Sequence, residues 1–187
     1  MLGWRPQGPA LAERSAPPVR TAPVPIAALY REHFQFIWRS LRRLGVREAS
    51  VDDALQDVFL VAHRKLATFE GRSSHRVWLF AIAMRVAAEH RRRDARLHLD
   101  DAAATGTART DESYELRRRV QLLDQLLATL SEEQRAVFVM SEIEGFSAPE
   151  IAEALGEKLN TVYSRLRLGR RRFERALARH QRDHGVR

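Results

Sequence analysis

Apolar side chains recur at steps of three and four residues through most of this chain, and glycine residues end several of the runs. The first run stops at Gly45 and consists of Ile26, Tyr30, Ile37, Leu41 and Leu44. This spacing gathers the apolar side chains on one face of a helix, so it predicts amphipathic helices. No segment shows the residue-by-residue alternation that is typical of a β-strand. The pattern therefore predicts an all-α protein.

Two more runs of the same kind follow. The second stops at Gly71 and contains Val51, Leu55, Val58, Phe59, Ala62, Leu66 and Phe69. The third leads into a basic stretch, Arg91 to Arg93, and contains Val77, Phe80, Ala81, Met84, Ala87 and Ala88. Three amphipathic helices with short connections predict a small helical bundle over residues 26–96.

The composition changes on both sides of this predicted bundle. Residues 1–25 hold most of the prolines and no apolar period, which predicts a disordered leader, either a regulatory extension or a misassigned start. This stretch lacks the apolar core of a secretion signal, and no run approaches the ~20 apolar residues of a membrane span. Residues 97–112 are small and polar, so they predict a flexible linker to a second domain at 113–182.

The second domain carries its own start signals for helices. Two predicted capping boxes open successive helices, Ser131 with Gln134 and Ser147 with Glu150. After the second of these helices Gly156 permits a tight turn, and a basic helix follows. A short helix, a glycine turn and a basic helix together predict a helix-turn-helix.

The basic helix begins near residue 160 and has two distinct sides. Its predicted inner side is Val162, Leu166, Phe173 and Leu177. Its predicted exposed side consists of Asn160, Ser164, Arg167 and Arg171, flanked by Tyr163, Arg165 and Arg170. Such a helix fits the major groove of DNA, where Arg, Asn and Ser contact base edges and other arginines contact phosphates.

The charge of the chain supports this interpretation only weakly. The formal net charge is +8, and every basic residue except Lys65 and Lys158 is arginine. A basic protein favours a polyanionic partner, nucleic acid first. An arginine-rich composition is also what a G+C-rich genome produces, and a charge run is usually a solvated face.

Several segments resemble one known family. Residues 130–138 (LSEEQRAVF), 144–156 (EGFSAPEIAEALG) and 160–166 (NTVYSRL) resemble domain 4 of the extracytoplasmic-function (ECF) sigma factors of bacterial RNA polymerase. Residues 52–59 (DDALQDVF) and 78–85 (WLFAIAMR) resemble domain 2 of the same family. The resemblance implies two small helical domains, a domain 2 bundle and a domain 4 helix-turn-helix, joined by a flexible linker.

The resemblance also implies which residues bind which partner. Core RNA polymerase would be bound through its β′ clamp helices and β flap, and the implied contacts on the second helix are Asp53, Gln56 and Asp57. The −10 promoter element would meet Arg72, Ser74, His75, Arg85, Glu89, Arg92 and Arg93. The −35 element would meet Asn160, Thr161, Tyr163, Ser164, Arg165, Arg167, Arg170 and Arg171.

Some of these assignments have a structural alternative. Asp52 and Asp53 lie in the first turn of their helix, where acids also stabilise the helix dipole. Trp78 is placed to stack on a DNA base or to fill the core. Arg85, Tyr163 and Leu168 depart from the family pattern, so no particular promoter sequence is implied.

The overall expectation is an alternative sigma factor that acts in the cytoplasm, controlled by an anti-sigma factor, with no cofactor or metal. The sequence is less consistent with two rival classes, an enzyme and a one-component repressor. An enzyme could use Asp52, Asp53, Asp57 and His63 as metal ligands, but the sequence has no second cluster of acidic and histidine residues to complete such a site. It also has no phosphate loop and no catalytic triad. A one-component repressor would need a ligand pocket or dimer seam within residues 26–96. The chain has no cysteine, which excludes disulfides and fits a reducing compartment.

Overall fold

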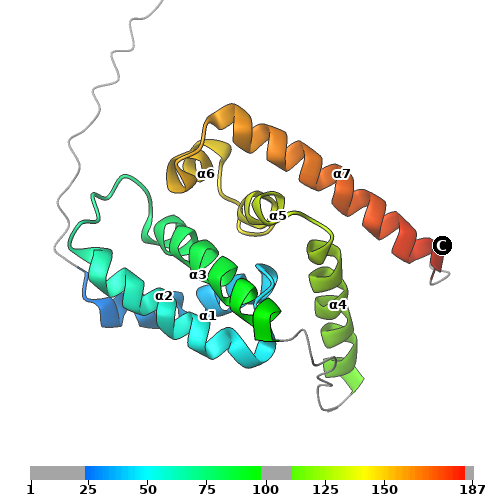
Figure 1. Cartoon of the computed structure of the whole chain (residues 1–187), viewed down its shortest axis with the longest axis horizontal. Coiled ribbons are helices and arrows are strands. Elements are labelled where there is room, and N and C mark those ends of the chain that lie inside the picture. The colour runs from blue at the N-terminus through cyan, green and yellow to red at the C-terminus, as the bar shows by residue number, and fades with distance from the viewer. Residues whose placement is uncertain (1–23, 98–110, 184–187) are drawn as a thin grey trace, which may run out of the picture.

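The computed structural model describes residues 24–97 and 111–183, and every regular element in those ranges is a helix (Figure 1). The predicted all-α fold is therefore confirmed. The predicted leader lies outside the described residues except for its last two, and so does most of the predicted linker, residues 98–110.

The first bundle consists of three helices: α1 (Ile26–Arg43), α2 (Val51–Leu66) and α3 (His75–Leu97). A short 3₁₀ turn, Glu48–Ser50, joins α1 to α2. Gly45 ends α1 with φ of 89°, a left-handed conformation that favours glycine. The second helix ends three residues before Phe69, whose ring packs 4.9 Å from that of Trp78. The third helix, α3, continues past its basic stretch, Arg91 to Arg93, as far as Leu97.

The faces predicted from the apolar spacing form the core of this bundle. Ile37, Leu41, Val58 and Phe80 are each fully buried. Tyr30 is the exception, because it lies at the rim between α1 and α2 and remains 43% exposed. The prediction that it shares the buried face is therefore wrong.

The second bundle consists of α4 (Asp111–Ala128), α5 (Glu132–Phe138), α6 (Ala148–Leu155) and α7 (Leu159–Asp183). The last turn of α5 widens into a π-helical segment, Val139–Ile143. Among the α4 side chains that the structure describes, residues 118–128, Leu126 and Leu127 near the end of the helix are buried, whereas Val120 is 46% exposed.

Local sequence signals account for the ends of these helices. Both predicted capping boxes are present, with Ser131 Oγ accepting from Gln134 N and Ser147 Oγ accepting from Glu150 N. Pro149 lies in the first turn of α6, where the missing N–H costs no intrahelical bond. Gly156 ends α6 with φ of 67° and begins the turn into α7. The helix-turn-helix prediction is thus matched by the backbone.

The two bundles pack against each other and share one continuous hydrophobic core. Figure 1 shows α5 lying between α7 and the first bundle, with α6 at one end of α3 and α4 at the other side. Phe146, just before α6, inserts its ring edge-on to those of Phe36 and Phe80, at centroid distances of 6.4 and 6.3 Å. An apolar wedge therefore joins the domains.

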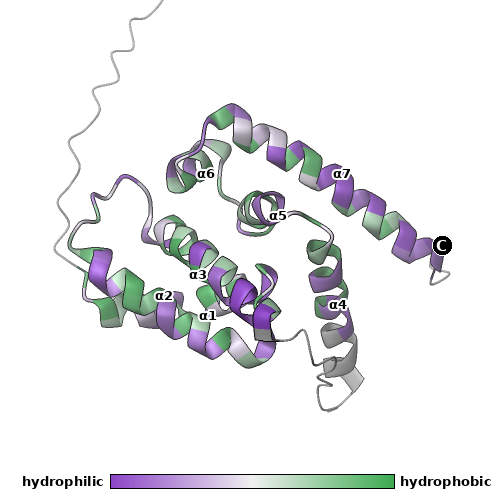
Figure 2. Ribbon diagram, viewed as in Figure 1, coloured by the Kyte–Doolittle hydropathy of each residue, from purple (hydrophilic) through white to green (hydrophobic). Residues whose placement is uncertain are grey.

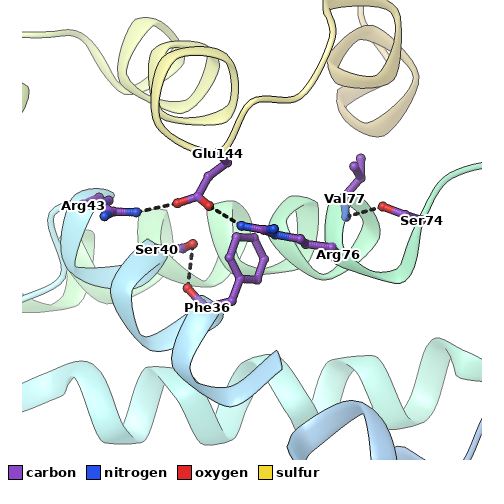
Figure 3. A network of polar contacts seen from close by, with 7 residues as sticks. All are labelled: Phe36, Ser40, Arg43, Ser74, Arg76, Val77 and Glu144. Carbon is purple, nitrogen blue, oxygen red and sulfur yellow. Dashed lines mark hydrogen bonds and ion pairs between the residues drawn. The ribbon is translucent and has the colours of Figure 1, made fainter. Parts of the chain in front are cut away.

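Polar contacts reinforce this closed arrangement. Glu144 projects from the second bundle between two arginines of the first and binds Arg43 Nη1 at 2.5 Å and Arg76 Nη2 at 2.7 Å (Figure 3). Only 5% of the Glu144 side chain is exposed, and the Arg76 guanidinium lies 4.3 Å over the ring of Phe36. We call this three-residue ion cluster the Glu144 bridge.

Further ion pairs cross the same boundary. Arg91 pairs with Glu132 at 2.9 Å, and Arg42 lies 3.6 Å from Asp124. Arg135 Nη1 donates to the Leu44 carbonyl at 3.3 Å. Burial raises the pKa of Asp124 despite the neighbouring arginines, and burial likewise lowers the pKa of Arg135. The charges at this boundary are therefore partly desolvated.

Candidate nucleic-acid and partner interfaces

One exposed stripe runs along the N-terminal half of α7. Asn160, Ser164, Arg167 and Arg171 lie four, three and four residues apart and are all exposed, so they project from one side of the helix. The opposite side is buried, with Val162 and Leu166 in the core. Figure 2 shows that hydrophilic residues dominate the outer side of α7. Capping, turn and core thus present this stripe to solvent as a rigid unit.

The other predicted −35 residues lie on the flanks of the stripe. Tyr163 is 52% exposed, whereas Thr161 is half-buried. Arg165 is also half-buried, and its Nη1 donates to Glu157 at 2.9 Å. Arg170 Nη2 donates to Glu142 at 2.7 Å. Acidic residues of the same domain therefore already pair with both flanking arginines. The two arginines of the stripe, Arg167 and Arg171, are less constrained.

A hollow of about 330 Å³ lies beside the loop between α2 and α3. It is lined by Thr68, Phe69, Glu70, Arg72, Ser73, Trp78, Ala81, Glu153 and Ala154. The predicted residue Arg72 is among these and pairs with Glu70 at 2.5 Å. Trp78 both packs on Phe69 and forms part of the wall, so the two alternatives for it are compatible. No sequence motif marks Ser73 or Glu153 as part of this hollow.

The two other loop residues have local roles. Ser74 Oγ accepts a hydrogen bond from Val77 N at 3.3 Å, in the manner of a helix N-cap for α3. The ring of His75 packs 4.7 Å from that of Phe69. These contacts fix the course of the loop.

The predicted −10 residues on α3 form a second exposed surface. Arg85, Glu89, Arg92 and Arg93 are all exposed, and the spacing of the first three places them along one side of the helix. Three of the four are cationic, as a track for a nucleic-acid backbone requires.

The predicted polymerase contacts lie on the outer side of α2. Asp53 and Gln56 are exposed, and Asp57 is half-exposed, with its Oδ2 atom 2.8 Å from Nε2 of the buried His90. Asp52 accepts a hydrogen bond from Trp38 Nε1 at 3.2 Å.

Sequence reasoning missed a groove beside these residues. A hollow of about 690 Å³ between α1 and α2 is lined by Ile26, Tyr30, Phe34, Asp52, Leu55, Gln56, Phe59, Leu60 and His63. Leu60, 50% exposed, follows Gln56 by one turn. An exposed tyrosine and leucine with polar neighbours at the edge resemble the centre and rim of a protein interface. Their exposure is the only signal, and it is not visible in the sequence.

The acidic residues of α2 do not assemble into a metal site. Over residues 24–97 and 111–183, no three His, Cys, Asp or Glu side chains are grouped as metal ligands would be. None of the helices in those ranges is long and apolar enough to cross a membrane.

Fold and surfaces together define a protein with a helix-turn-helix domain packed on a separate three-helix bundle. Models of two protein families match these parts, sigma-70 region 2 over residues 29–97 and sigma-70 region 4 over residues 120–173. The chain belongs to the sigma-70 family of RNA polymerase sigma factors, in its ECF group. Members of this family are transcription-initiation factors, so the chain is not an enzyme.

Named relatives and solved structures agree with this assignment. The RNA polymerase sigma factor YlaC of Bacillus subtilis is 34% identical over 152 residues, covering 76% of this chain and 88% of that protein. The ECF RNA polymerase sigma factor SigM of Mycobacterium tuberculosis is 30% identical over 155 residues, covering 80% and 75%. CnrH, solved with the cytosolic domain of CnrY, has a TM-score of 0.63 at 25% identity, covering 82% of this chain and 87% of that one.

Proposed function

We propose that the two domains divide promoter recognition between them. Residues 113–182 bind the −35 duplex through α7, and residues 26–96 bind core RNA polymerase and the −10 strand. The observation that carries the proposal is the α7 stripe, four polar and basic side chains in line on a helix that a capped helix and a glycine turn hold in place. Arg and Asn on such a helix can contact base edges in the major groove.

Core polymerase binds, in this proposal, along the groove between α1 and α2. The groove is lined mainly by apolar side chains, with Gln56 among them, and Asp53 and Asp57 lie on the same helix, α2, outside this lining. A helix of the β′ clamp suits such a groove, because an amphipathic helix buries its apolar side in it and satisfies its polar side at the rim.

The closed arrangement bears on the order of events. Glu153 of α6 lies in the wall of the hollow at the α2–α3 loop, where the −10 strand enters in this proposal. A carboxylate there repels a phosphate backbone. The second domain must therefore move away from α3 before the strand is captured.

The proposal extends to regulation and location. CnrH was solved in complex with the cytosolic domain of CnrY, and this likeness supports a protein partner for the present chain. We propose that this partner is an anti-sigma factor. RNA polymerase and promoter DNA, the two proposed partners, are in the cytoplasm, so we assign the protein to that compartment.

The DNA half of the proposal is tested with reconstituted holoenzyme. Promoters opened by the wild type are first mapped by run-off transcription, and their −35 binding is then measured with Arg167→Ala and Arg171→Ala. Each replacement should weaken binding by about fivefold to 150-fold, since a good base contact contributes about 1–3 kcal/mol. Arg182→Ala, at the far end of the same helix, is the matched control. Equal binding by all variants would remove the stripe from the interface.

The polymerase half is tested without DNA. A Gln56→Ala, Asp57→Ala double variant should lose most of its affinity for core enzyme in a fluorescence titration, and Lys65→Ala, an exposed residue elsewhere on α2, should keep it. If the wild type does not bind core enzyme at all, the proposal fails.

A further inference from the structure

His90 is a buried residue that has polar contacts on two sides. Only 2% of its side chain is exposed, and it lies on α3 facing α2. Its Nε2 atom is 2.8 Å from Oδ2 of Asp57, whose own side chain is 50% exposed. The ring therefore holds, from inside the bundle, a carboxylate that reaches the surface.

Arg93 contacts the same ring one turn further along α3. Its Nη2 atom is 3.1 Å from Nδ1 and 3.4 Å from Nε2 of His90. Because Nε2 donates to Asp57, Nδ1 is the ring nitrogen that is left to accept a hydrogen bond from Arg93. Asp57, His90 and Arg93 thus form a continuous row from the outer side of α2, through the interior, to the basic surface of α3.

This row fixes the geometry of Asp57. Nε2 of His90 donates to one carboxylate oxygen, Oδ2, so the other oxygen, Oδ1, is not engaged by His90. An unheld aspartate would lose rotational freedom on binding a partner, and that loss of entropy weakens binding. A carboxylate that is already held avoids that cost. The arrangement is therefore suited to presenting a fixed acceptor to a binding partner.

We propose that His90 is a positioning residue for polymerase binding, which holds the Asp57 carboxylate in its binding orientation and is itself held by Arg93. This inference rests on the proposed function, because it requires Asp57 to contact core polymerase. In this arrangement His90, which is buried, and Arg93, which lies on the predicted DNA-binding surface, both support the polymerase-binding surface.

The test is a double-mutant cycle in the full-length chain, read as affinity for core RNA polymerase in the absence of DNA. His90→Phe keeps a ring but removes the donor, and it should weaken binding about fivefold to tenfold. His90→Gln restores an N–H donor and should recover most of the affinity. In an Asp57→Ala background, His90→Phe should cause no further loss, because the group that His90 holds is gone. Thermal unfolding of each variant is followed in parallel.

Arg93 supplies a second readout. Arg93→Ala should weaken polymerase binding by a smaller factor, about twofold to threefold, although no DNA is present. Arg96→Ala, also exposed and one turn further along α3, should leave that affinity unchanged. If His90 had only a structural role, Arg93→Ala and Arg96→Ala should have the same effect on polymerase affinity.

The outcomes distinguish a failure of the proposed polymerase surface from a failure of the positioning role of His90. If Asp57→Ala leaves polymerase affinity unchanged, the proposed polymerase surface is wrong. If Asp57→Ala weakens binding but His90→Phe does not, or if His90→Phe weakens it equally with and without Asp57, the surface stands and the positioning role of His90 is overturned.

Discussion

Replacing Glu144 with glutamine should separate the two domains in a measurable fraction of molecules. The side chain is 5% exposed and accepts hydrogen bonds from Arg43 and Arg76, whose own side chains are 23% and 45% exposed. A hydrogen bond to a charged group contributes about 1.5–3 kcal/mol. Glutamine retains one oxygen acceptor, and both arginines can return to water. The net loss should therefore be about 2 kcal/mol, below the 3–5 kcal/mol typical of a broken, fully buried pair.

A loss of that size changes the ratio of open to closed molecules about thirtyfold, since 1.4 kcal/mol corresponds to a factor of ten. The chain has no native cysteine, so a dye pair can be attached at Lys65→Cys in α2 and Arg182→Cys in α7. Energy transfer between the dyes then reports the distance between the two bundles. The Glu144→Gln variant should show a larger population with low transfer efficiency.

Glu142→Gln is the matched control for this experiment. Glu142 pairs with Arg170 inside the second bundle, two residues from Glu144, so its replacement removes an ion pair without touching the boundary. Equal transfer distributions for wild type and Glu144→Gln would refute the reasoning, and so would equal opening by both variants.

Three further outcomes can be measured on the isolated chain. Gly45→Ala should lower the free energy of unfolding by about 1–2 kcal/mol in a denaturant titration, because φ is positive and the added methyl group would meet Arg135; an unchanged midpoint would count against it. Ser147→Ala should cost about 1 kcal/mol of stability and return the pKa of Glu150, which hydrogen bonds from Ser147 lower, toward its usual value in an NMR titration. Glu150 thus stabilises the fold above the ordinary glutamate pKa, and this contribution is lost as pH falls through the lowered pKa. For Asp124, whose pKa burial raises, the sign reverses: stability should increase as pH falls from the raised pKa toward the ordinary aspartate value, and Asp124→Asn should abolish that increase.

The sequence predicted those features whose causes are local. Both capping boxes, the turn at Gly156 and the exposed stripe of α7 depend on residues within a few positions of one another, and all are present. Helix periodicity shows which side of α1 is apolar, but it does not show where neighbouring helices stop covering it. Tyr30 was therefore expected in the core and lies at the rim of a groove.

Features that join distant segments were not predictable in this way. Glu144 is 101 positions from Arg43 and 68 from Arg76, and each looks in the sequence like any solvated charge. His90 adjoins a run of arginines and has no periodic partner, so nothing in the sequence marks its contact with Asp57. The domain order followed from the motifs, whereas the closed packing required the three-dimensional structure.

The wedge at Phe146 and the Glu144 bridge hold the same boundary by forces with different dependences on solution conditions. Ion pairs weaken as added salt screens them, to the extent that solvent reaches them. Burial of aromatic surface has the opposite character, since it weakens on cooling and is strengthened by excluded salts such as sulfate. Temperature and ionic strength should therefore act on different parts of the contact between the bundles. Cooling weakens the aromatic part, and a salt that screens charge without being excluded from protein surfaces weakens the ionic part. The free chain should therefore be most open in a cold solution of such a salt.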